Sequence, residues 1–142
     1  MIIDKYLYFR KETDQDSDDG IDDSLFLPAR QITAMVPTST TALTIFFESM
    51  YNNQGGTDNE VVISDSVVLT CTAGKVKQAI QTLVQAINSN HLYQDGLITV
   101  ADDVTTTYLT SAAAADETLS SGTYVDTGIT ACASITIATA LS

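Results

Sequence analysis

One segment of the chain, AGKVKQAIQTLVQAINSN at residues 73–90, carries the period of an amphipathic helix. Thr72 is suited to cap its start, and the Asn-Ser-Asn run is suited to end it. We therefore expect one long helix at about 74–89. Its large apolar side chains recur at helical spacing and form a narrow stripe: Val76, Ile80, Leu83, Val84 and Ile87. A lone helix with one apolar stripe needs a sheet to lie on, which predicts an α+β fold.

The rest of the chain favours β-strands. It holds 21 threonines, and threonine is a strand former whose hydroxyl suits a half-exposed sheet face. With 142 residues, 44% of them hydrophobic, we expect a single domain over 1–142 with a mainly antiparallel sheet. The expected strands are 2–10, 31–36 between Pro28 and Pro37, 41–51, two short ones around a turn at Ser64–Ser66, one within 97–103, and a last one at 133–139.

The net charge of −12, with only six basic residues, limits the partners of the protein. Nucleic acid binding requires Lys and Arg to displace counterions from phosphates, and no stripe of such residues is present. An anionic membrane surface would also repel this chain. We expect neither nucleic acid nor membrane as a partner. The N-terminus, MIIDKYLYFRKE, lacks the features of a signal peptide.

Residues 13–24, TDQDSDDGIDDS, hold six aspartates and partly match the pattern of an EF-hand calcium loop. The acids required at positions one, three and five would be Asp14, Asp16 and Asp18. Position six is Asp19 where glycine is needed, and position twelve is Leu25 where a bidentate glutamate is needed. A true EF-hand is therefore excluded. A looser calcium loop stays open, but we favour an acidic connector kept in water, and we predict no metal.

The remaining reactive side chains form no recognisable constellation. His91 is the single histidine, so a zinc site has no ligand set. Asp102 and Asp103 at a strand end are interpreted as a solvated turn. Cys71 and Cys132 lie in apolar segments and are interpreted as buried thiols, with a disulfide left open. Because nucleophile-elbow, P-loop and dinucleotide motifs are also missing, we predict no catalytic residues, no cofactor and no enzyme activity.

The strand from Thr41 raises the question of what covers a second sheet face. If Leu43, Ile45 and Phe47 face the core, Phe46 points the other way. The sheet could be covered on both faces by the chain itself, or the exposed face could contact another chain, since one helix cannot cover both. The residues that we predict at an interface are apolar: Leu25, Phe26, Leu27, Phe46, Ile135 and Ile137.

Four segments together resemble a known group of proteins. They are FRKETDQDSDDGIDDS, LPARQITAMVPTSTTALTIFFESM, VVLTCTAGKVKQAIQTLVQAINS and DGLITVADD, which span about residues 7–103. This combination resembles small virion structural proteins of tailed phages that infect marine cyanobacteria. The Ala- and Thr-rich C-terminal third lies outside the resemblance, and the segments contain no catalytic motif.

The resemblance implies a non-enzymatic role in the virus particle, assembled in the host cytoplasm. The expected function is a capsid decoration or cement protein, with the major capsid protein or other virion proteins as partners and homo-oligomerisation expected. A tail or neck component is the main alternative. A module that binds carbohydrate or the host surface is a further one, although the chain has no Trp and its six Tyr are scattered in sequence.

Overall fold

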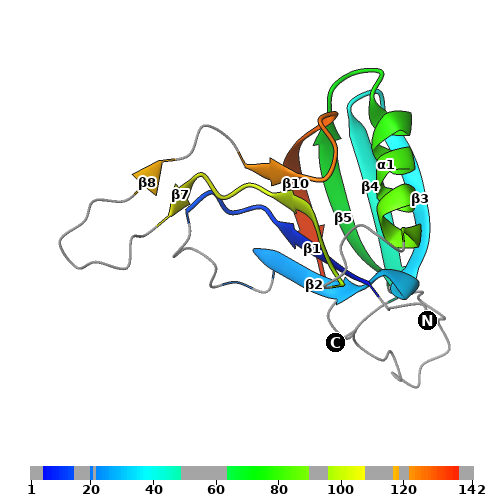
Figure 1. The fold of residues 1–142 in the computed structure, drawn as a ribbon, viewed down its shortest axis with the longest axis horizontal. Helices are drawn as coiled ribbons and strands as arrows, with labels where there is room; N and C mark the ends of the chain where they lie inside the picture. Colours follow the sequence, from blue (N-terminus) through cyan, green and yellow to red (C-terminus); the bar gives the residue numbers. More distant parts are fainter. Residues whose placement is uncertain are drawn as a thin grey trace, which may run out of the picture.

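Two four-stranded sheets and one helix make up most of the described chain (Figure 1). The structure is a computed structural model, and it describes residues 5–14, 20, 22–48, 64–89, 96–107, 117–118 and 122–137. The first sheet runs β2 (Ser24–Pro28), β1 (Tyr6–Arg10), β6 (Leu97–Asp102), β9 (Thr123–Tyr124). The second sheet runs β10 (Ile129–Thr136), β5 (Ser64–Cys71), β4 (Ala42–Glu48), β3 (Ile32–Ser39). A small pair, β7 (Thr106–Thr107) with β8 (Glu117–Thr118), stands apart.

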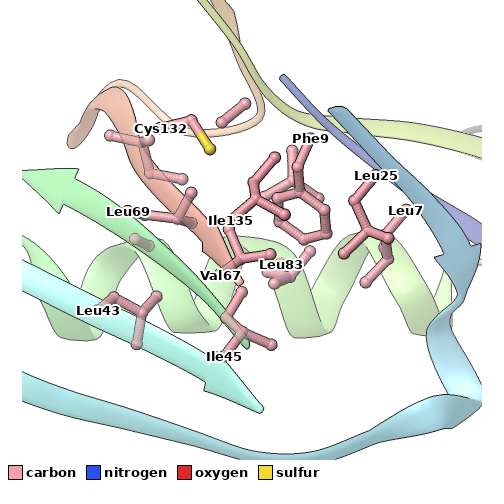
Figure 2. Close-up of a cluster of buried hydrophobic side chains, with 14 of the residues drawn as sticks. Leu7, Phe9, Leu25, Leu43, Ile45, Val67, Leu69, Leu83, Cys132 and Ile135 are labelled. Carbon is pink, nitrogen blue, oxygen red and sulfur yellow. The ribbon is translucent and has the colours of Figure 1, made fainter. Parts of the chain in front are cut away.

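The α+β prediction with mainly antiparallel pairing is confirmed, although the strands divide into two sheets. Among the described strands, β1 and β6 form the only parallel pair. In both sheets the alternation of side chains sends one set inward, as the strand period requires. Leu7 and Phe9 of the first sheet and Ile45 of the second are fully buried in one shared core. Figure 2 shows side chains from both sheets converging on Leu83 of the helix.

The helix α1 (Val76–Asn88) begins later than the pattern predicted. Gly74 has φ +82°, in the left-handed region, which interrupts a helix, so the helix starts two residues after the approximate position predicted, and the predicted cap at Thr72 is wrong. Lys75 holds the N-cap position without a side-chain hydrogen bond. At the other end, the buried ammonium of Lys5 donates hydrogen bonds to the carbonyl oxygens of Ala86, at 2.6 Å, and Ser89. A cation at this position stabilises the C-terminal end of the helix dipole.

The buried side of α1 is also rotated from the predicted stripe. The buried residues of the helix are Val76, Ala79, Leu83 and Ala86. Ile80 and Ile87 are partly buried, and Val84 is 38% exposed. The two alanines allow the helix to approach the strands closely, so the larger residues beside them lie at the margin. Leu83 is therefore the large side chain at the centre of the helix–sheet contact, whereas the predicted stripe placed Ile80 there as well. Truncating Leu83 to alanine is expected to lower the free energy of unfolding by about 2–5 kcal/mol.

Several strand boundaries differ from the prediction. Residues 24–28, expected only as an apolar cluster, form β2, and Pro28 is its last residue. Pro37 lies inside β3 rather than beyond its end; proline is tolerated there because β3 is an edge strand. Residues 64–71 form one strand, so the turn predicted at Ser64–Ser66 is wrong, and Asp65 is fully buried. The last strand starts at Ile129 instead of 133. The strands expected at 97–103 and from Thr41 are confirmed within the described residues.

Candidate functional site

The outer side of the first sheet carries an uncharged aromatic face. Tyr8 pairs across the strands with Phe26, and Tyr6 pairs with Pro28 on one side and Leu97 on the other. The rings of Tyr6 and Phe26 are stacked, with centroids 5.2 Å apart and planes 1° apart. Phe26 is 55% exposed, so its ring lies largely in water. We call these five residues the aromatic face.

The aromatic face follows directly from the two-residue period of β1 and β2. Leu7, Phe9, Leu25 and Leu27 point into the core, so the residues between them must point outward. A surface of this kind is unusual in a chain with 18 acidic residues, because none of the five face residues is charged. Phe26 and Leu97 are its exposed members, and neighbouring exposed apolar side chains are a feature of contact sites.

The predicted interface residues do not form one surface. Leu25, Leu27, Ile135 and Ile137 are buried in the core of the chain itself, so a partner cannot reach them, and their assignment to an interface is corrected. The reason is that the two sheets cover each other's inner faces. Phe46 does lie on the side of β4 opposite the core, where it is half-buried. Phe26 and Phe46 therefore occupy outer faces of different sheets and are not brought together.

Two tyrosines that belong to the aromatic face were absent from the predicted interface. The alternation in IIDKYLYFR places Tyr6 and Tyr8 on one face of β1. The local pattern does not show that β1 pairs with β2, and this pairing brings Phe26 beside the two tyrosines. That pairing joins two segments separated by the acidic connector, so it becomes visible only in the folded chain.

The acidic connector is organised at both of its described ends. The guanidinium of the buried Arg10 donates hydrogen bonds to the carbonyl oxygens of Glu12, at 3.3 Å, and Asp14, at 2.7 Å. Farther along, the backbone N–H of Gly20 donates to the carboxylate of Asp23 at 2.6 Å. Lys11 pairs with Asp22 at 3.2 Å, and this hydrogen bond chiefly raises the pKa of the lysine.

The looser calcium loop considered for the acidic connector lies partly outside the described residues. Asp16 and Asp18 lie outside the described residues, as does His91. Among the residues that the structure describes, no group of three or more His, Cys, Asp or Glu side chains could hold a metal ion. The absence of a metal from the protein therefore stays a prediction.

Asp103 forms a buried cluster where a solvated turn was predicted. Its carboxylate accepts a hydrogen bond from the hydroxyl of Tyr124 at 2.6 Å and from the backbone N–H of Cys132 at 3.0 Å. Only 8% of Asp103 is exposed. Burial raises the pKa of this carboxyl above its ordinary value, although both hydrogen bonds act in the opposite direction. The solvated-turn interpretation is therefore wrong for Asp103, because the β9–β10 segment folds over it.

The two cysteines are buried and free, as interpreted from the sequence. Burial raises the pKa of Cys132 to about 12, with the charge of Asp103 adding to the effect. Burial likewise raises the pKa of Cys71. Thiols that resist ionisation are poor nucleophiles, so neither cysteine has the properties of a reactive one.

A second buried carboxylate, Asp126, ties the β9–β10 turn to the helix. It accepts hydrogen bonds from Thr82 at 2.6 Å, from Gln78 at 3.1 Å and from the backbone N–H of Gly128 at 2.8 Å. An open hollow of about 440 Å³ lies beside it, lined by Gly122, Tyr124, Asp126, Thr127, Ile129 and Thr130. Because the carboxylate of Asp126 and the hydroxyl of Tyr124 are already engaged within the chain, we treat this hollow as part of the turn's architecture.

Comparison with known proteins gives no match to a protein family, a curated protein or a solved structure. Within the described part of the chain, none of the helical segments has both the length and the apolar character needed to cross a bilayer. Among the features described above, the aromatic face is the best candidate for a functional site, because it combines a ring stack with an exposed aromatic side chain.

Proposed function

We propose that this protein is a non-enzymatic structural subunit of a phage particle, which decorates or cements the capsid surface by docking its aromatic face on capsid protein. The observation that carries the proposal is the uncharged stack of the half-buried Tyr6 on Phe26, which is 55% exposed. The resemblance of residues 7–103 to virion proteins supports the assignment of the partner.

The energetics of the aromatic face suit docking. A buried aromatic side chain removes about 150–250 Å² from water, and burial contributes about 25 cal/mol per Å². Covering the exposed half of Phe26 alone would contribute about 2 kcal/mol. Tyr6, Tyr8 and Leu97 would add to this before the entropy of association is subtracted. Aromatic residues of this kind are enriched among the residues that dominate binding energy at protein interfaces.

Binding to empty shells of the capsid protein tests the proposal. Wild type should co-sediment with shells, and Phe26→Ser should bind at least tenfold more weakly, since about 1.4 kcal/mol corresponds to a factor of ten. Val84→Ser is the matched control, because Val84 is an exposed apolar residue on the helix and is not part of the aromatic face. Wild type that fails to bind shells, or Phe26→Ser that binds as well as Val84→Ser, would contradict the proposal.

The number of copies per purified particle separates the capsid from the tail. A capsid-surface protein should be present in on the order of hundreds of copies, because the shell repeats its subunits by symmetry. A dozen or fewer copies, by quantitative mass spectrometry, would indicate a tail or neck component instead.

One observation favours a second candidate function, the binding of carbohydrate at a host surface. The fold gathers Tyr6 and Tyr8 beside Phe26, whereas in the sequence the tyrosines are scattered. Aromatic rings and hydroxyls together can contact both the apolar and the polar sides of a sugar. A shift of the tyrosine fluorescence on titration with host glycans, lost in Phe26→Ser, would favour this function over capsid docking.

A further inference from the structure

The aromatic face ends on one side at a strongly acidic segment. Beyond the pair of Tyr8 and Phe26, the next pair on the same side of the two strands is Arg10 with Ser24. Residues 11–23 join the two strands there, and they hold seven acidic residues and one lysine. The net charge of this segment is therefore −6, half of the −12 of the whole chain.

Arg10 holds the start of this segment on the side of the aromatic face. Successive side chains of a strand point to opposite sides, so Arg10 lies on the same side of β1 as Tyr8. Its guanidinium donates hydrogen bonds to the carbonyl oxygens of Glu12, at 3.3 Å, and Asp14, at 2.7 Å. The backbone that carries Glu12 and Asp14 is therefore fixed at the border of the aromatic face.

Two further acidic residues extend this border. Asp102 of β6 pairs with Arg10 from the other side and is half-buried. The side chain of Asp22, just before β2, is 54% exposed and lies 3.2 Å from the ammonium of Lys11. We call the four acids at this end of the first sheet the acidic border: Glu12, Asp14, Asp22 and Asp102.

The charges at the two ends of the aromatic face are unequal. Residues 10–23 contain two basic residues against seven acidic ones, so this end stays net negative whichever ion pairs form. At the opposite end, the next charged residue of the chain after Pro28 is the exposed Arg30. A partner with an apolar centre is therefore attracted most strongly when its own cation lies toward the acidic border.

We infer that the aromatic face binds a basic segment of another protein, which places an apolar side chain on Phe26 and a Lys or Arg against the acidic border. The inference rests on the proposed docking role of the face and adds the chemistry of the partner. Two residues of a strand span about 7 Å, so an extended segment would present its apolar side chain and its cation two residues apart. A second copy of the chain, with its own net charge of −12, lacks this complementary charge.

Charge complementarity gives this docking a distinct dependence on salt. Salt screens the attraction between exposed opposite charges, with a screening length of about 10 Å at 0.1 M. Apolar contact depends on the area removed from water and is not screened in this way. Binding through the face and the border together should therefore weaken as salt rises, whereas binding through the face alone should not.

Calorimetric titration with two synthetic peptides tests the chemistry of the partner. One peptide carries leucines and arginines at two-residue spacing, and the other has glutamates in place of the arginines. At low salt, wild type should bind the arginine peptide about tenfold more tightly than the glutamate peptide, because only the former complements the acidic border. Phe26→Ser should weaken binding of the arginine peptide about fivefold, and Val84→Ser should leave it unchanged. An arginine peptide that does not bind, or that binds no better than the glutamate peptide, would overturn the inference.

Charge reversal tests whether the cation of the partner lies at the acidic border. Asp22→Lys should weaken binding of the arginine peptide about fivefold, because it places a cation beside the cation of the peptide. Glu48→Lys is the matched control: Glu48 is exposed at the end of β4 in the second sheet, and its substitution changes the net charge equally. Asp22→Lys that binds the arginine peptide as well as Glu48→Lys would also overturn the inference.

The same variants separate this inference from capsid docking. If shells bind wild type and Asp22→Lys equally well at every salt concentration, capsid docking stands and the basic partner is disproved. If the two peptides and the charge reversals behave as expected but shells do not bind, the basic partner stands and capsid docking is disproved.

Discussion

Asp103 and Asp126 are two carboxylates with the same exposure, 8%, and opposite pKa shifts. Asp103 follows β6 and accepts hydrogen bonds from Tyr124 and Cys132. Burial is the largest influence on it and raises its pKa, and the nearby charge of Asp102 adds to the effect. Burial also pushes the pKa of Asp126 upward, but its hydrogen bonds outweigh burial, and its pKa lies below the ordinary value.

The difference teaches that burial alone does not decide how a carboxylate behaves. Asp126 has three different donors, from Thr82, Gln78 and the backbone of Gly128, and the charge of Lys75 adds to them. Asp103 has two donors and a neighbouring acid. Each further donor stabilises the ionised form, and the carboxyl of Asp103 is also enclosed by more protein than that of Asp126, so donors and burial together set the direction of each shift. The ionised Asp126 acts as a clamp that holds the turn to the helix. Asp103 has a raised pKa, so its ionised form lowers the stability of the folded state at neutral pH.

Removing Asp126, which has more hydrogen-bond donors than Asp103, should have the largest effect on the free energy of unfolding. Asp126→Ala leaves the donors on Thr82, Gln78 and Gly128 without their acceptor, and a buried donor without a partner costs about 1–3 kcal/mol. We expect the free energy of unfolding to fall by about 3 kcal/mol in urea titrations, since two of the donors are partly exposed and can recruit water. Asp22→Ala is the control: Asp22 is exposed, and its loss should change stability by less than about 1 kcal/mol. Equal effects of the two substitutions would disprove the clamp.

Removing one hydrogen-bond donor from Asp103 should have a smaller effect on the free energy of unfolding. Tyr124→Phe deletes the hydroxyl that donates to Asp103 at 2.6 Å. We expect a loss of about 1–2 kcal/mol at pH 7, because a hydrogen bond to an ionised group is among the stronger ones. The loss should shrink at low pH, where Asp103 is protonated. Tyr8→Phe, on the aromatic face, provides the comparison and should be nearly neutral. A Tyr124→Phe variant as stable as Tyr8→Phe would show that the hydroxyl is equally well satisfied by water.

The pH dependence of stability should separate the two carboxylates by sign. The pKa of Asp103 is raised in the folded state, so its favourable contribution is present below the ordinary pKa of 3.8 and is lost as pH rises through the folded value. The pKa of Asp126 is lowered, so its contribution is present above 3.8 and is lost as pH falls through the folded value. Relative to wild type, Asp103→Asn should therefore gain stability as pH rises from 3 to 7, and Asp126→Asn should lose it. Slopes of the same sign in urea titrations at several pH values would refute the comparison.

Much of the architecture could be predicted from local patterns. The helix was expected because its apolar residues have a period of 3.6, and β1, β4 and β6 because theirs have a period of two. The buried state of Cys71 and Cys132 followed from their apolar neighbours. These features depend on residues close in sequence, so a local pattern was enough.

The candidate sites were less predictable, because their parts come from distant segments. Asp103 becomes a buried cluster only when Tyr124, 21 residues later, and Cys132, 29 residues later, fold over it. Leu25 and Ile135 were expected at a surface, yet two facing sheets enclose both. Phe26 joins an aromatic face only because β2 pairs with β1.

The sequence by itself determined which side chains share a face of each strand and of the helix, because that depends only on the period of the local backbone. It also determined the strong negative charge of the protein. Only the tertiary structure decided which of those faces are covered, which edges stay open and which carboxylates lose their water. Those outcomes depend on how strands pair and sheets stack, and such contacts join residues that no local period connects.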